Sequence, residues 1–137
     1  MKINLDGLES LQELYIPIPP VPASRPKVSR WSTYYGKNHT QYIKSWGAWL
    51  DQMPQVWEYL DQDDRLAVSA EFVCNRPKKI TSLTPRGDID NYLKLVLDCL
   101  TNSNFWHDDK AVEFVIAHKR YAAEHEEPHT TVRVFTV

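Results

Sequence analysis

The chain has 137 residues, of which 42% are hydrophobic and 12% aromatic, and its formal net charge is −2. This length fits one domain with a single core, and the composition predicts a folded globular protein. No apolar run is long enough for a membrane-spanning helix, and the acidic N-terminal sequence lacks the apolar centre of a signal peptide. We therefore expect one cytoplasmic domain over residues 1–137, with 1–13 as a possible N-terminal extension.

The spacing of cysteine and histidine argues against a disulfide or a zinc site. Cys74 and Cys99 each stand in an apolar run, and neither belongs to a CxxC pair. The five histidines show no HxxxH or HExxH spacing, which zinc enzymes commonly use. The sequence predicts two reduced thiols in the core.

Basic residues are concentrated in two segments, although the net charge is slightly negative. Residues 21–44 and 75–86 contain several Lys and Arg side chains and no acid, whereas acids gather at 58–64 and 124–127. A net charge near zero does not favour nucleic-acid binding, but the distribution of charge matters more than the sum. Two basic loops around an acidic centre could still hold a polyanion.

The N-terminal third is predicted to contain one short helix, one strand and a long loop. Residues 5–14 could form the helix, and residues 15–18 read as a strand that Pro17 restricts to a sheet edge or a strand end. Residues 19–37 are rich in Pro, Ser, Arg and Tyr and predict a loop. Loops of this length in compact domains are usually functional or disordered.

The middle of the chain predicts a helix followed by a strand and a second basic loop. Asn38 is the expected N-cap, apolar residues recur at helical spacing up to Met53, and Pro54 ends the run. The apolar sequence at 66–74 predicts a strand. Residues 75–87, with two prolines and Gly87, predict a loop.

The last third predicts the clearest helix, at 90–101, and then two strands. Leu93, Val96, Leu97 and Leu100 share one face of that helix, and Asn91, Lys94 and Asp98 share the other. Residues 112–121 and 130–137 read as strands, and the acidic turn between them predicts an antiparallel pair. The order of elements predicts a single α+β domain, with a small mixed sheet and helices packed on it.

Two carboxylates stand where the second basic loop enters the helix. Asp88 and Asp90 are two residues apart and lie on one side of an extended backbone. A short loop after the helix could bring Asp109 beside them. Three converging carboxylates repel one another, and a hard divalent cation such as Mg²⁺ or Mn²⁺ relieves that repulsion. Lys94 lies one helical turn after Asp90 and could stabilise charge on a phosphate undergoing attack.

A purely structural interpretation of the same residues stays open on spacing alone. Asp90 could cap the helix, Asp88 could occupy a turn, and Lys94 with Asp98 could form an ordinary i,i+4 pair. Asp109 enters the argument only through an assumed loop geometry.

The region 85–112 resembles the RusA family of Holliday junction resolvases. The match comprises Asp88-Ile89-Asp90-Asn91-Tyr92-Leu93-Lys94, then Asp98-Cys99-Leu100-Thr101, then Phe105-Trp106-His107-Asp108-Asp109. Residues 16–35 resemble the family more loosely, through a proline-rich edge strand followed by a loop of Arg and aromatic residues. Arg86 stands where some members have a longer basic run.

The resemblance implies a RusA-like fold and a homodimeric, Mg²⁺-dependent endonuclease that nicks four-way DNA junctions. Carried over to this sequence, the metal-binding catalytic acids are Asp88, Asp90 and Asp109, and Lys94 is the catalytic lysine. Asn91 and Asp108 would support the site. The side chains expected to contact DNA are Arg25, Lys27, Arg30, Lys37, Arg76, Lys78, Lys79 and Arg86.

Symmetry and stacking chemistry fit the same activity. A four-way junction is nearly two-fold symmetric, and a homodimer offers two sites related by the same symmetry. Trp31, Tyr34 and Tyr35 could stack on unpaired bases, or serve local packing or dimer contacts. The alternatives are a broader flap or fork endonuclease, a non-catalytic module that binds branched DNA or protein, and another phosphoryl enzyme. Another phosphoryl enzyme would need a glycine-rich loop to hold phosphate, and the four glycines of the chain are not clustered.

Overall fold

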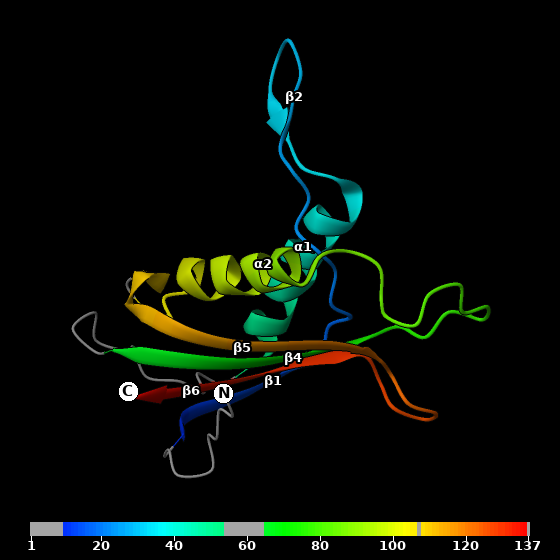
Figure 1. Ribbon diagram of the computed structural model, residues 1–137. Helices are drawn as coiled ribbons and strands as arrows, with labels where there is room; N and C mark the ends of the chain where they lie inside the picture. Colours follow the sequence, from blue (N-terminus) through cyan, green and yellow to red (C-terminus); the bar gives the residue numbers. More distant parts are fainter. Residues whose placement is uncertain (1–9, 54–64, 107, 137) are drawn as a thin grey trace.

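The computed structural model describes residues 10–53, 65–106 and 108–136, and it shows two helices on one face of a four-stranded sheet (Figure 1). A single α+β domain was expected, and this fold class is confirmed. The sheet contains β1 (Ser10–Ile16), β4 (Leu66–Cys74), β5 (Val112–Tyr121) and β6 (His129–Thr136). The helices are α1 (Lys37–Gln52) and α2 (Ile89–Asn102).

The strands lie in the order β1-β6-β4-β5, so the expected β5–β6 hairpin is wrong. β4 pairs with β5 in parallel on one side and with β6 antiparallel on the other. The reason is the crossover through α2, which returns the chain so that β5 runs alongside β4 in the same direction. The acidic turn after β5 therefore leads to β6, which lies on the other side of β4 and does not pair with β5.

β1 occupies the second half, residues 10–14, of the helix expected at 5–14. Leu14 and Ile16 are buried while Glu13 and Tyr15 are exposed, a period of two that belongs to a strand with one face on the core. The strand is at a sheet edge and ends directly before Pro17, as the proline predicted. Residues 10–13, which were expected to be part of a possible N-terminal extension, thus belong to the sheet. Residues 5–9 of the expected helix lie outside the described residues.

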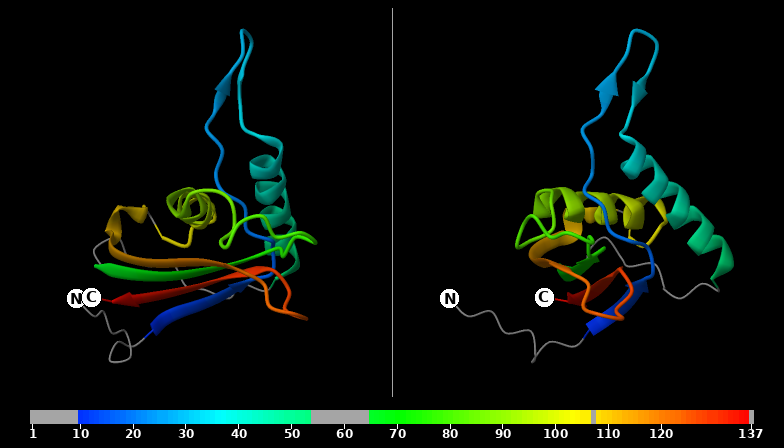
Figure 2. Two further views of the ribbon diagram at one scale, coloured as in Figure 1. Left: turned by 45° about the vertical axis from the view of Figure 1, so that its right-hand side comes forward. Right: turned by 90° about the vertical axis from the view of Figure 1, so that its right-hand side faces the viewer.

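A two-stranded hairpin interrupts the long loop expected at 19–37. β2 (Lys27–Val28) and β3 (Thr33–Tyr34) pair antiparallel, and the hairpin projects from the body of the molecule on the helix side of the sheet (Figure 2). α1 follows at once and begins after Gly36, so the expected N-cap Asn38 is already inside the helix. Pro54, which was expected to end this helix, lies outside the described residues.

The core lies between the sheet and the two helices. α2 buries Tyr92, Leu95, Val96, Cys99 and Leu100, whereas the predicted core residues Leu93 and Leu97 are only half-buried beside it. The buried face is therefore rotated from the predicted one, and the exposed face carries Asp90, Lys94 and Asp98. Cys74 and Cys99 are free and buried, as expected. None of the described helices has the length and apolar character needed to cross a membrane.

Candidate active site

Asp88 and Asp90 stand at the start of α2, and their carboxylates form no side-chain hydrogen bond or ion pair with the described residues. Asp88 occupies the N-cap position in an extended conformation, but its side chain makes no capping hydrogen bond. Its backbone carbonyl accepts from the N–H groups of Asn91 and Tyr92. Asp90 lies in the first turn, and both acids are exposed. Across the described residues, neither carboxylate has an ion-pair partner, so both are free to bind a cation.

The loop that presents Asp88 is held by side chains from two neighbouring elements. Lys119 Nζ donates to the carbonyl oxygens of Pro85 at 2.7 Å and Gly87 at 2.5 Å. The hydroxyl of Tyr121 donates to Thr84 O at 3.1 Å, and the hydroxyl of Tyr92 donates to Arg86 O at 2.6 Å. Four successive carbonyls, 84 to 87, are thus each hydrogen-bonded by a side chain, and we call these contacts the carbonyl clamp. A loop outside any sheet ladder gains its rigidity in this way.

The strand register explains why the clamp forms. Lys119 and Tyr121 are two residues apart in β5, so both side chains leave the same face of the sheet. They pair in register with Phe72 and Cys74, which are buried under α2. That face is the one on which the loop lies. No role was expected for Lys119 or Tyr121, and the alternation of the strand, which places Lys119 on the same face as Ala117 and Tyr121, is the signal that could have singled out Lys119.

Gly87 joins the clamp to Asp88 in a conformation that other residues avoid. Its φ is +94°, and a Cβ placed on it would lie 2.8 Å from Pro22 Cγ and 3.2 Å from Tyr92 Cε2. Only glycine adopts such a φ readily, and no larger residue would fit against the proline ring. The direction in which Asp88 leaves the loop therefore depends on this glycine.

Asp109 lies beyond the other end of α2, in the single 3₁₀ turn η1 (Asp109–Ala111). Partial burial raises the pKa of its carboxyl, and a hydrogen bond and negative charge from Asp108 add to the shift. The charge of Asp98 raises the pKa further, while Lys94 opposes it. Lys94 Nζ also lies 3.8 Å from an Asp98 carboxylate oxygen, both side chains being well exposed. Asp98, Asp108 and Asp109 form an acidic cluster that one lysine only partly neutralises.

Aromatic anchors fix this second acidic cluster against α2. Phe105 and Trp106 are fully buried, and Trp106 Nε1 donates to Thr101 Oγ1 at 2.7 Å. Trp46 of α1 donates from Nε1 to Ser103 Oγ at 2.7 Å. The turn that follows α2 is therefore tied to both helices, and Asp108 and Asp109 follow it directly.

The expected convergence of Asp88, Asp90 and Asp109 does not occur within one chain. α2 has 14 residues, and at 1.5 Å per residue such a helix is about 21 Å long. Asp88 precedes the helix, whereas the charges acting on Asp109 come from Asp98 and Lys94, further along it. Within the described ranges, no group of three or more His, Cys, Asp or Glu side chains could hold a metal ion. A short connection after a helix keeps the next residues at the helix end, and this is why the assumed loop geometry was wrong.

The expected DNA-contacting residues occupy two exposed surfaces. One is the hairpin and the chain beside it, and the other is the loop between β4 and α2 (Figure 1). On the hairpin, Trp31 is 86% exposed, and the guanidinium of Arg30 lies 5.4 Å from its ring centroid. The exposed basic residues are Arg25, Lys27, Arg30 and Lys37 on the first surface, and Arg76, Lys78, Lys79 and Arg86 on the second.

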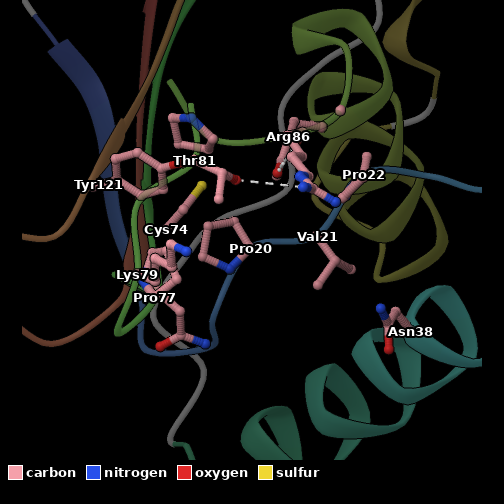
Figure 3. Close-up of a pocket in the computed structure, with 14 residues that line it drawn as sticks. Pro20, Val21, Pro22, Asn38, Cys74, Pro77, Lys79, Thr81, Arg86 and Tyr121 are labelled. Carbon is pink, nitrogen blue, oxygen red and sulfur yellow. Dashed lines mark hydrogen bonds between the residues drawn. The ribbon is translucent and has the colours of Figure 1, made fainter. Parts of the chain in front are cut away.

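A pocket of about 610 Å³ lies between the second basic surface and the chain that follows β1 (Figure 3). Pro20, Val21 and Pro22 form one wall, and the clamped residues Pro85 to Gly87 form another. Arg86 Nη2 reaches Thr81 Oγ1 at 3.4 Å across part of it. The remaining lining residues are Asn38, Cys74, Asn75, Pro77, Lys79, Thr81, Tyr92 and Tyr121.

The structure is that of a small α+β domain with two exposed carboxylates at the start of a helix, and comparison with known families assigns it. Residues 17–135, nearly the whole chain, match the family described as Endodeoxyribonuclease RusA. The chain belongs to this family, and its domain is that of an endodeoxyribonuclease. No curated protein matches it significantly.

Proposed function

We propose that this protein is a Mg²⁺-dependent, structure-selective endodeoxyribonuclease that resolves four-way DNA junctions by paired nicks. The observation that carries the proposal is a pair of exposed carboxylates in a chain of the RusA family, Asp88 at the end of a clamped loop and Asp90 in the first turn of α2. Carboxylates two residues apart repel one another, and a bound cation relieves that repulsion. A preorganised acid pair is what phosphodiester hydrolysis requires.

The proposed cofactor is Mg²⁺, with Mn²⁺ as a substitute, because the available donors are carboxylate oxygens. A bound divalent cation would supply an activated water and neutralise charge on the phosphate. Asp88, Asp90 and Asp109 are the proposed ligands. One chain does not fit a complete three-acid site, because Asp109 belongs to the cluster further along α2. Lys94, between the two acidic groups, is proposed to bind the scissile phosphate.

The separation of the acids supports a homodimer. If all three acids serve one site, carboxylates at the two ends of α2 must come from two copies of the chain. A two-fold dimer would then carry two equivalent sites, which matches a junction that is cut on two strands. Asn91 and Asp108 are proposed to support the sites, Asp108 through its place beside Asp109.

DNA binding is assigned to the two basic surfaces. Their side chains are exposed and can neutralise phosphates, which makes the affinity for any branched DNA strongly dependent on salt. Trp31 at the hairpin is nearly fully exposed, and we propose that it stacks on a base at the branch point. Shape and phosphates, not base sequence, would then select the substrate.

A gel assay that compares a four-way junction, a flap, a fork and a linear duplex, each in Mg²⁺ and in EDTA, tests the proposal. Symmetric nicks in the junction alone, seen only with Mg²⁺, are the expected result. Cleavage of all branched substrates alike would replace junction resolution with a broader branched-DNA nuclease. Tight junction binding with no nicking in Mg²⁺ or Mn²⁺ would instead identify a binding module.

A further inference from the structure

The pocket of Figure 3 lies at the carboxyl ends of the two parallel strands. Cys74 is the last residue of β4, Tyr121 is the last residue of β5, and both line the pocket. β4 is also where the sheet changes from parallel to antiparallel pairing, since β6 lies on its other side. In open sheets, ligands bind outside the carboxyl ends of parallel strands, close to a change in strand order.

The charge of the pocket is positive in a protein whose net charge is −2. Lys79 and Arg86 line it, and both side chains are exposed. The residues that line the pocket include no Asp or Glu. An anion such as a phosphate is therefore favoured there, while Asp88, which follows the pocket wall at Gly87, repels an anion only from outside.

Proline and aromatic rings make up much of the remaining wall of the pocket, beside the polar side chains of Asn38, Asn75 and Thr81. Pro20, Pro22 and Pro77 contribute proline rings, and Tyr92 contributes an aromatic side chain that is itself buried. Rings with few rotatable bonds lose little entropy when a flat group packs against them. A volume of about 610 Å³ lies inside the range of ligand pockets, which is about 300–1,000 Å³. A planar base with an attached phosphate matches both the apolar walls and the cations.

We propose that this pocket binds one unpaired nucleotide of the DNA branch point, with its base against the proline walls and its phosphate toward Lys79 and Arg86. The inference rests on the proposed function, because it names the part of the branched substrate that reaches the site. Taking a base out of a duplex is less costly where stacking is interrupted, as at a branch point, than within an arm. Since the clamped wall ends at Gly87, the bound nucleotide would hold its strand beside Asp88.

Photocrosslinking in EDTA tests this placement without requiring cleavage. A four-way junction carries one 4-thiothymine, either next to the branch point or within an arm, and adducts are mapped to peptides by mass spectrometry. Branch-point probes are expected to label residues 74–87 or 20–22. Thr81→Phe, which places a ring in the pocket, should abolish these adducts while the protein still binds the junction and melts at the wild-type temperature.

Two lysines provide a matched control for charge. Lys79→Gln removes a cation that lines the pocket, and Lys44→Gln removes the same charge from an exposed residue of α1 that neither lines the pocket nor belongs to either basic surface. At saturating protein, Lys79→Gln should lower the branch-point adduct yield severalfold, and Lys44→Gln should leave it unchanged.

Three results would overturn the inference. The first is a junction-binding protein whose branch-point adducts map to the hairpin alone, and the second is an adduct yield that Thr81→Phe does not change. The third is dissociation of a dimer by Thr81→Phe in light scattering, which would assign the pocket to a second copy of the chain. A wild-type protein that neither binds nor cuts a junction would instead refute the proposed function itself.

Discussion

The ammonium of Lys119 donates hydrogen bonds to the carbonyl oxygens of both Pro85 and Gly87, so a β5 side chain fixes the residue that precedes the first candidate catalytic acid. Lys119→Met keeps the aliphatic stem and removes both bonds. Hydrogen bonds from a charged donor contribute about 1.5–3 kcal/mol, so a modest loss of stability is expected. Single-turnover cleavage should fall about tenfold or more, because a displaced catalytic group costs rate steeply.

Junction affinity in EDTA separates positioning by Lys119 from general damage to the fold. It should fall less than cleavage does in Lys119→Met, since Lys119 belongs to neither basic surface and acts on the second one only through the loop that carries Arg86. Lys44→Met removes an exposed lysine from α1 and serves as the control for charge. Unchanged cleavage by Lys119→Met, in a preparation whose wild type is active, would show that the clamp does not set the position of Asp88.

Gly87 and Gly47 form a matched pair for a stability measurement. Gly87→Ala must hold a φ of +94° and places its Cβ 2.8 Å from Pro22 Cγ, and a strained φ of this kind costs about 1–3 kcal/mol. Gly47 is inside α1 and nothing lies within 4 Å of its added Cβ, so Gly47→Ala should stabilise by about 0.5–1 kcal/mol. Urea unfolding of the two variants should therefore shift in opposite directions. A neutral Gly87→Ala would contradict the close packing described for that turn.

The raised pKa of Asp109 predicts how stability depends on pH. An acid whose pKa is higher in the folded state than in the unfolded state makes folding less favourable once it ionises. Stability should therefore fall as the pH rises from the ordinary Asp pKa of 3.8 through the raised folded value. Asp109→Asn removes this dependence, so thermal melting without metal should show a smaller loss between acid and neutral pH. An unchanged pH profile in the variant would refute the crowding of Asp109 with Asp108 and Asp98.

Asp90→Asn distinguishes a metal ligand from a helix-terminus charge. The substitution keeps size and shape, and loss of a favourable charge at a helix start costs only about 0.3–1 kcal/mol. If Asp90 binds the catalytic cation, cleavage should fall by several orders of magnitude. Junction binding in EDTA should persist or tighten, because one charge that repels phosphate has gone. Melting and nicking are measured on one preparation, and an active variant would remove Asp90 from the site.

A substitution of Trp31 at the hairpin tip should weaken binding to the junction with little effect on stability. Trp31 is 86% exposed, so Trp31→Ala should leave the melting temperature near that of the wild type. Base stacking on an aromatic side chain contributes about 1–3 kcal/mol, so junction affinity should fall by about one order of magnitude. Trp31→Phe retains a ring and should recover most of the affinity. Equal affinity of all three proteins would assign the tip a role outside DNA binding.

Local sequence patterns were sufficient for the elements that carry the active site. The strands at 66–74 and 112–121 were predicted with their observed bounds. The first is a long apolar run, as in a buried strand, and the second is rich in β-branched and aromatic residues. The helix at 90–101 differs from α2 by one residue at each end. Asp88 and Asp90 were recognised because they lie within that local pattern.

Relationships between distant segments could not be predicted in the same way. Nothing in 112–136 shows that β4 separates β5 from β6, since that arrangement follows from sheet pairing and the crossover through α2. The position of Asp109 beside Asp98 depends on how Phe105 and Trp106 anchor the turn. The carbonyl clamp joins β5 to a loop more than 30 residues earlier. Each of these contacts is decided by tertiary packing, which a local pattern does not contain.

The inner position of β6 determines the order in which this protein can assemble. β1 pairs only with β6 among the described strands, and β6 follows every other described strand in the chain. The N-terminal strand must therefore wait, unpaired, until the last strand has left the ribosome, and pairing between such distant segments is intrinsically slow. Nascent chains that stop before residue 129 would expose the edges of β1 and β4 together, which makes them candidates for aggregation or chaperone capture.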